Sequence, residues 1–164
     1  MLTKKELFSQ VAALLNKQGF RIIQEDRNRP WGGFYVLDEA QARDFARTYF
    51  PGEDFEGIKS TVKLSPKVLM VAPEKRLSWQ YHHRRAEIWC CVEGEVAVVT
   101  SHTDKEDKKH FLQPGDIIRL QQGERHRLIG LSSWGVVAEI WQHTDPDHPS
   151  DEEDIVRLQD DFGR

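Results

Sequence analysis

The chain has 164 residues, a hydrophobic fraction of 38% and a net charge of −4, which suits one folded domain with a modest core. Its charged fraction of 30% includes both signs and does not indicate disorder. The acidic balance argues against a nucleic-acid partner, because such proteins need a basic surface.

The two cysteines, Cys90 and Cys91, are neighbours in the sequence. In a strand their side chains point to opposite faces, so a disulfide between them is not expected. This favours a reducing compartment, and we expect a cytoplasmic protein. The N-terminus has no apolar stretch of signal-peptide length. No run approaches the roughly 18 apolar residues that span a bilayer, so no membrane partner is expected.

Residues 1–66 are expected to form helices and the first strands, packed on the body of the fold. Thr3 and Glu6 have the spacing of a helix capping box. Leucines and Val11 follow at helical intervals, and Gly19 is a natural stop. The sequence therefore predicts a first, amphipathic helix between Thr3 and Gly19.

The rest of this N-terminal region alternates short elements and turn signals. A short strand is expected over residues 20–24, followed by a loop over residues 29–34 that contains Pro and Gly. Asp38 can cap a second helix over residues 39–49. The following Pro-Gly pair ends this helix, and residues 52–60 are expected to form a surface loop.

Residues 67–144 are expected to form the core of a barrel. Short runs rich in Val, Ile, Leu and Trp alternate there with turn signals such as Glu93-Gly94. Roughly eight short strands at about ten-residue spacing indicate an antiparallel sandwich or barrel. The runs cover residues 68–72, 77–82, 87–92, 95–101, 110–112, 117–120, 126–131 and 136–143. Residues 145–164 form an acidic tail that is expected to pack near the pocket, within the same single domain.

One segment of the barrel region carries side chains that bind metals. Gln80 and His82 share a face of a strand, because alternate residues do so. After a turn, Glu87 faces the same space from the partner strand, and His126 can arrive from a later strand. Two nitrogen and two oxygen ligands suit Zn²⁺, Mn²⁺, Fe²⁺, Co²⁺ or Ni²⁺ without choosing among them. On spacing alone, the alternative of ordinary surface residues beside a turn stays open.

The same segment resembles the first motif of the cupin superfamily, in which two histidines one residue apart precede a glutamate and a glycine. Gln80 stands at the first histidine position, and this is the pattern of phosphomannose isomerases. More narrowly, the chain resembles the type II phosphomannose isomerase domain from Arg29 to its C-terminus. The matching stretches are residues 29–32, 77–89, 123–128, 153–157 and 162–164.

The resemblance implies a mainly all-β fold, a cupin double-stranded β-helix or jelly-roll barrel with one or two N-terminal helices. It implies a metal-dependent aldose–ketose isomerase of the mannose-6-phosphate isomerase type, whose small-molecule partner is a sugar phosphate. One divalent metal ion is expected, Zn first, with Mn, Fe, Co or Ni as alternatives. Because cupins often form dimers, the resemblance also implies a possible homodimer. The implied metal ligands are Gln80, His82, Glu87 and His126.

Two kinds of residue are expected around this metal. Glu139, on a strand of the barrel wall, is the first candidate for the base that moves the proton. Arg157 is the second candidate for a catalytic residue, beside Glu139. A phosphate group needs arginine or lysine donors, and the arginines at family motif positions are expected to bind substrate. These are Arg85, Arg127 and Arg164.

Two departures from the family pattern keep a second function open. Arg84 and Ile88 stand where the family usually has histidine. Such changes near a metal can remove catalysis and keep binding, so the alternative is a non-catalytic sugar- or metabolite-binding metal cupin. A dioxygenase on the same scaffold is disfavoured by Gln80, and a metal-free sugar epimerase has no use for the ligand set.

Overall fold

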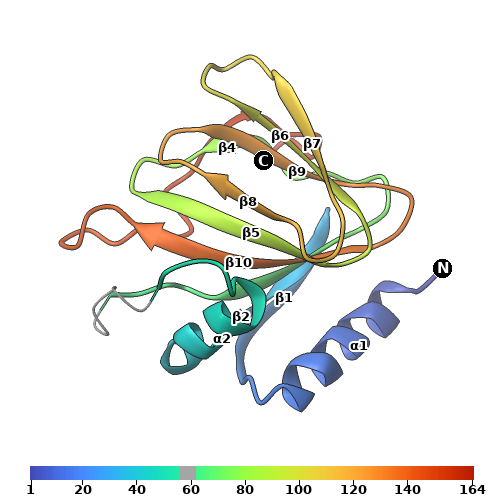
Figure 1. The fold of residues 1–164 in the computed structure, drawn as a ribbon. Coiled ribbons are helices and arrows are strands. Elements are labelled where there is room, and N and C mark those ends of the chain that lie inside the picture. Colours follow the sequence, from blue (N-terminus) through green and yellow to red (C-terminus); the bar gives the residue numbers. More distant parts are fainter. Residues whose placement is uncertain (56–61) are drawn as a thin grey trace.

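The structure is a computed structural model and describes residues 1–55 and 62–164. Two antiparallel sheets face each other, and two α-helices from the N-terminal region lie outside one of them (Figure 1). The expected mainly β barrel with N-terminal helices is confirmed. The loop expected over residues 52–60 lies partly outside the described residues.

Helix α1, Lys4–Lys17, begins at the predicted capping box. The backbone N–H of Glu6 donates to Thr3 Oγ1 (3.2 Å), and the backbone N–H of Thr3 donates to the Glu6 carboxylate (2.8 Å). Gly19, with φ of +85°, follows its C-terminal end. The helix buries an apolar stripe against the sheet, formed by Leu7, Phe8, Val11 and Leu15.

Two N-terminal strands differ from the expectation. β1 spans Ile22–Arg29 and β2 spans Gly32–Leu37, so the strand predicted at residues 20–24 is longer and the loop predicted at residues 29–34 is a tight turn. β1 is an edge strand with mostly exposed or half-buried residues. The full length of β1 was not predicted because its sequence is charged, and an edge strand need not alternate apolar and polar residues.

The second helix is confirmed. A 3-10 turn, η1, Glu39–Gln41, leads into α2, Ala42–Tyr49. The carboxylate of Asp38 accepts the backbone N–H of Ala40 (3.0 Å), as expected of a capping residue.

Each of the eight runs predicted between residues 68 and 143 corresponds to a strand, and β11 near the C-terminus was not predicted. The bounds are β3 Lys67–Val71, β4 Trp79–Tyr81, β5 Arg85–Glu93, β6 Val96–Ser101, β7 Lys108–Leu112, β8 Ile117–Leu120, β9 Arg125–Gly130, β10 Gly135–His143 and β11 Val156–Gln159. One sheet has the order β1-β2-β3-β10-β5-β8 and the other β11-β4-β9-β6-β7. The N-terminal region and the tail thus share sheets with the barrel core. The boundaries 1–66, 67–144 and 145–164 stay a prediction.

The central strands of the six-stranded sheet, such as β3 and β10, are buried on both faces, which creates two cores. On β10, Ala138 and Ile140 pack with residues of both helices, whereas Val137 belongs to the barrel interior. Figure 1 shows both helices on the outer side of this sheet, away from the five-stranded sheet. The alternation leaves Glu139 and Trp141 on the barrel side, where they line a pocket. Within residues 1–55 and 62–164, no helix is long and apolar enough to cross a membrane.

Gly32 holds β2 close to the barrel, and we expect Gly32→Ala to destabilise the fold. A Cβ there would lie 1.9 Å from the Met70 backbone oxygen, and φ of +146° is strained for an L-residue. The expected loss is about 2–4 kcal/mol in the free energy of unfolding, measured by denaturant titration. Gly52→Ala is the control, because nothing lies within 4 Å of a Cβ at that position. Equal midpoints for the two variants would contradict the prediction.

Candidate metal centre

The four predicted ligands come from the two sheets and converge in the barrel interior. Gln80 lies on β4, His82 follows that strand directly, Glu87 lies on β5 and His126 on β9. Gln80 is paired directly with His126 in the β4–β9 register. All four side chains are buried, with exposed fractions of 7% or less. The reading of these residues as surface groups beside a turn is therefore excluded.

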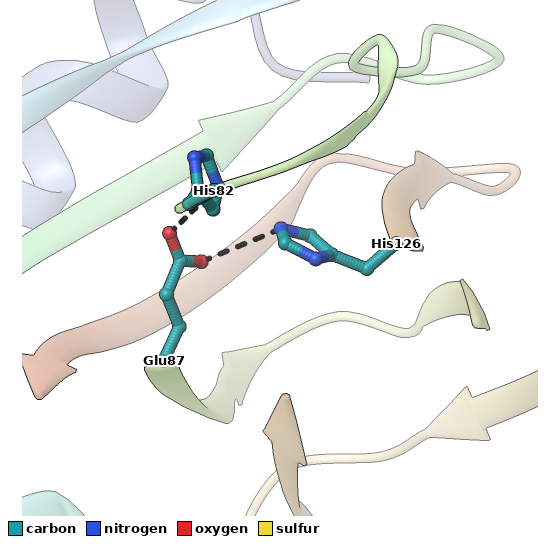
Figure 2. Close-up of side chains that lie close together, drawn as sticks. All are labelled: His82, Glu87 and His126. Carbon is teal, nitrogen blue, oxygen red and sulfur yellow. Dashed lines mark ion pairs between the residues drawn. The ribbon is translucent and has the colours of Figure 1, made fainter. Parts of the chain in front are cut away.

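Three of them form a group that can hold a metal ion. The ligand atoms of His82, Glu87 and His126 all lie within 4.8 Å of one another. His82 Nε2 is 3.1 Å from one Glu87 carboxylate oxygen, and His126 Nε2 is 3.7 Å from the other. In Figure 2 the two oxygens of Glu87 point toward the two rings.

The hydrogen bonds behind the two rings assign their tautomers. His82 Nδ1 lies 2.7 Å from the Asp154 carbonyl oxygen, and His126 Nδ1 lies 2.9 Å from the Glu124 carbonyl oxygen. A carbonyl oxygen only accepts, so each Nδ1 carries the hydrogen and each Nε2 carries a lone pair. Arg85 Nη2 lies 3.2 Å from Nε2 of His82. In the described part of the chain, His126 Nε2 is buried without a hydrogen-bond partner. An imidazole lone pair left in this way next to a carboxylate fits a divalent metal ion.

The charge states also fit a metal. Burial lowers the pKa of His126 to about 4, although the charge of Glu87 opposes this, so the ring is neutral at pH 7. Burial would raise the pKa of Glu87, but His82 and Arg85 outweigh it and hold that pKa well below its usual range. The neutral imidazole of His126 and the ionised carboxylate of Glu87 are forms that bind a metal without first losing a proton.

The fourth predicted ligand, Gln80, lies beside this group. Its Oε1 accepts a hydrogen bond from Ser78 Oγ (3.2 Å), and both residues line the pocket. An amide oxygen is a neutral ligand that adds no charge to the site. Its part in metal binding stays a prediction.

An open pocket lies beside this centre, and Gln80 and Glu87 are among the residues that line it. Glu139 lies in its wall, and its two carboxylate oxygens accept the indole N–H groups of Trp89 (2.7 Å) and Trp141 (2.8 Å). Burial, followed by the charge of Glu87, raises the pKa of Glu139 to about 8. The inward orientation expected for Glu139 is therefore present, and its carboxyl titrates close to neutral pH.

Arg85 is a buried basic residue of the pocket wall. Its Nε donates to the Glu87 carboxylate (2.7 Å), and its guanidinium stacks 3.6 Å from the Trp141 ring centroid. Arg157 and Arg164 also line the pocket. The substrate-binding and catalytic roles expected for these three arginines stay predictions.

Arg127 is not among the residues that line this pocket. Its buried guanidinium donates to the Leu77 carbonyl oxygen (2.9 Å), to Glu106 (3.3 Å) and to Gln159. Arg127 directly follows His126 on β9, and consecutive residues of a strand point to opposite faces. This position supports a structural role in holding the tail and gives no support to substrate binding.

The two departures from the family pattern also lie away from the pocket lining. Ile88 is buried in the core under the helices, on the face of β5 opposite Glu87. Arg84 lies in the turn before β5, where its guanidinium pairs with Asp151 at 3.5 Å. Neither position changes the chemistry of the pocket wall.

Sequence reasoning missed several residues around the pocket. Arg29, Lys67 and Trp141 line it, and Asp154 fixes the turn that carries His82. Trp141 was open to prediction, because it is two residues from Glu139 and shares its face. The others belong to the N-terminal hairpin, the first barrel strand and the tail, and no local pattern connects these segments.

A family model described as "Mannose-6-phosphate isomerase C-terminal" matches residues 38–160. The chain belongs to this family. Its two-sheet barrel is accordingly a cupin of the mannose-6-phosphate isomerase family. The alginate biosynthesis protein AlgA of Pseudomonas aeruginosa is 27% identical over 125 residues, which cover 76% of this chain and 24% of AlgA. The chain thus spans about a quarter of that curated relative.

Solved structures agree on the fold of this mannose-6-phosphate isomerase family member. The capsular polysaccharide assembling protein CapF from Staphylococcus aureus superposes with a TM-score of 0.55 at 16% identity, over 85% of this chain and 32% of CapF. Vicilin from tomato, Solanum lycopersicum, superposes with a TM-score of 0.52 at 18% identity, over 85% of this chain and 34% of vicilin. At such identities the likeness concerns the fold alone.

Proposed function

We propose that this protein is a metal-dependent sugar-phosphate isomerase that interconverts an aldose and a ketose, such as mannose 6-phosphate and fructose 6-phosphate. The observation that carries the proposal is Glu139. Its buried carboxyl has a pKa raised to about 8 and lines one pocket with Glu87, a member of the His82, Glu87 and His126 group. A perturbed acid beside a metal-binding group in a pocket is the arrangement expected of proton-transfer enzymes. Family membership supports the same reaction.

The proposed reaction moves a proton between C1 and C2 of the sugar through an enediol-type intermediate. A divalent ion, when bound, would supply the positive charge that stabilises the developing oxyanion. Glu139 would take the proton from one carbon and return it to the other, since its pKa lies near neutral pH. The indole N–H groups of Trp89 and Trp141 keep its carboxylate in one orientation.

The proposal includes the identity and the setting of the metal. We propose Zn²⁺ as the resident ion, with Mn²⁺, Fe²⁺, Co²⁺ or Ni²⁺ as alternatives, and Gln80 as the fourth ligand beside the two histidines and the glutamate. Both cysteines are free and buried, which supports work in a reducing compartment such as the cytoplasm. A homodimer is proposed on family habit alone.

The decisive test is to incubate the metal-loaded protein with mannose 6-phosphate and to measure the conversion to fructose 6-phosphate by NMR. Glu139→Gln is expected to lower kcat by about 10²- to 10⁴-fold, because an amide cannot accept the proton. Metal content should stay at the wild-type level. Glu93→Gln, on an exposed position of β5, is the matched control. A folded, metal-loaded protein that converts no hexose, pentose or heptose phosphate would remove the enzymatic proposal.

A second candidate function is a non-catalytic sugar- or metabolite-binding metal cupin. One observation favours it: both oxygens of Glu139 are already engaged by indole N–H groups. The bond from Trp89 opposes the effect of burial on the pKa of Glu139, and the two bonds together leave its oxygens less available to accept a proton from carbon. Thermal stabilisation by a sugar phosphate without any turnover would identify this function.

A further inference from the structure

Lys4, the first residue of α1, places its ammonium group against the turn between β1 and β2. Its Nζ donates to the backbone carbonyl oxygens of Arg27 (2.8 Å) and Gly32 (2.8 Å). A longer bond reaches the carbonyl oxygen of Arg29 (3.4 Å). An ammonium group has three N–H donors, so this one turn of the chain engages all of them. The turn is therefore held at both of its ends by a side chain from another element.

The backbone of this turn is irregular, which explains why it needs a donor from outside. The pairing of β1 with β2 shifts register between Asp26 and Arg29, and Pro30 has no N–H to donate. Carbonyl oxygens in such a half-buried turn need a partner, because an unpaired polar group away from water costs free energy. A hydrogen bond from a charged donor is stronger than one from a neutral donor. Lys4 supplies that charged donor.

Helix α1 and the β1–β2 hairpin form one packed unit around these bonds. The rings of Phe8 and Tyr35 meet edge to face, 5.4 Å between centroids, and the Tyr35 hydroxyl donates to the Phe8 carbonyl oxygen (2.9 Å). Gly33 permits this approach, because a Cβ at that position would lie 2.7 Å from the Phe8 ring. The family-model match begins at residue 38. The packed unit therefore belongs to the part of the chain that precedes the matched family domain.

The turn that Lys4 holds also forms one wall of the pocket beside the metal centre. Trp31, within the turn, lines that pocket, is 5% exposed and belongs to the apolar core of the barrel interior. Its carbonyl oxygen accepts the backbone N–H of Ala72 (2.8 Å), which ties the turn to the end of β3. Gly32, whose carbonyl oxygen Lys4 binds, is the next residue, so a shift of the turn would move the indole.

We propose that Lys4 is a positioning residue for the pocket, which fixes the β1–β2 turn and thereby the place of the Trp31 indole in the pocket wall. Lys4 is not among the described residues that line the pocket, so it acts through the turn. A rigid indole limits the shape of the ligand that fits beside it, so the property affected is ligand binding rather than proton transfer. That this ligand is a sugar phosphate rests on the proposed function, whereas the dependence of the turn on Lys4 rests on its hydrogen bonds.

A test without any ligand uses 5-fluorotryptophan in place of the five tryptophans. The ¹⁹F NMR signal of Trp31 is assigned by its absence in Trp31→Leu. Lys4→Met keeps the length of the side chain and removes its donors, so this signal should shift and broaden. Lys4→Arg keeps the charge and should restore it in part. The control is Lys5→Met, the same change at the exposed neighbouring position of α1. An unchanged Trp31 signal in a folded Lys4→Met protein overturns the proposal.

Titration of the metal-loaded protein with mannose 6-phosphate separates this role from a general loss of stability. Lys4→Met is expected to weaken binding by about 3- to 10-fold at unchanged affinity for Zn²⁺. Where turnover is present, KM should rise at constant kcat. In a Trp31→Leu background, Lys4→Met should have little further effect, and fully additive effects of the two changes overturn the proposal. A wild-type protein that binds no sugar phosphate removes the proposed function, and the ¹⁹F comparison still decides the role of Lys4.

Discussion

Glu87→Gln is expected to reduce the affinity for divalent metal by more than about 100-fold. The glutamate supplies the negative charge of the proposed ligand group and lies between His82 and His126 (Figure 2). Loss of an outer hydrogen bond to a metal ligand costs about 10- to 100-fold in metal affinity, and loss of the charged ligand itself should cost more. Chelator competition with Zn²⁺ or Co²⁺ measures the affinity without any assay of turnover.

The control for Glu87→Gln is Glu93→Gln, which changes the same side chain at an exposed position of the same strand. Both proteins should be compared below their thermal transitions, since Glu87→Gln also leaves Arg85 without its buried carboxylate partner. Wild-type metal affinity in a folded Glu87→Gln protein would remove the metal centre from this pocket.

Asp154→Asn should weaken both the fold and the metal centre, although Asp154 is not a ligand. Its carboxylate accepts the backbone N–H groups of His83 and Arg84 (both 2.9 Å) and the hydroxyl of Ser150 (2.6 Å). Its carbonyl oxygen accepts from His82 Nδ1. The expected cost is about 2–4 kcal/mol in the free energy of unfolding, because hydrogen bonds to a charged acceptor are lost. Metal affinity should fall by about 10- to 100-fold, because the side-chain hydrogen bonds that hold the Asp154 carbonyl oxygen against His82 are weakened.

The pH dependence of this effect has a definite sign. Burial would raise the pKa of Asp154, but hydrogen bonds from Ser150 and from two backbone N–H groups outweigh it and lower that pKa to about 2. A carboxyl with a lowered pKa stabilises the fold above its unfolded value of 3.8, and this stability is lost as pH falls toward about 2. The difference between wild type and Asp154→Asn should therefore be full at pH 7 and shrink below about pH 4.

Denaturant unfolding at several pH values measures the difference in stability, and chelator competition measures the metal. Glu153→Gln, an exposed neighbour, is the control. An Asp154→Asn protein with a constant stability deficit from pH 7 to pH 3 would contradict the assigned role of the carboxylate.

Local patterns accounted for much of the barrel. The capping box at Thr3 and Glu6, the cap at Asp38 and the period-two alternation around Gln80 and His82 depend on residues close in sequence. The inward orientation of the Glu139 side chain likewise follows from alternation along β10. The family resemblance added His126 to the ligand set, because spacing alone does not show which strands pair.

The edges of the fold escaped these patterns. β1 is charged and mostly exposed, and β11 is short and mostly exposed, so neither shows the alternation of a half-buried strand. Both edges supply pocket arginines, Arg29 and Arg157, and the register of β11 decides that Arg157 faces the metal centre. Arg127 lies on the opposite face of β9 from His126, where its guanidinium donates to Gln159 of the C-terminal tail.

The sequence by itself predicted the four candidate metal ligands, the helices at the N-terminus and the mainly β character of the chain. Apart from His126, which the family resemblance added, each of these depends on side-chain spacing within a strand or helix turn. Only the tertiary structure decided which arginines share the pocket and that Asp154 supports His82. These depend on contacts between segments distant in sequence, and such contacts arise from the packing of the whole barrel rather than from any local period.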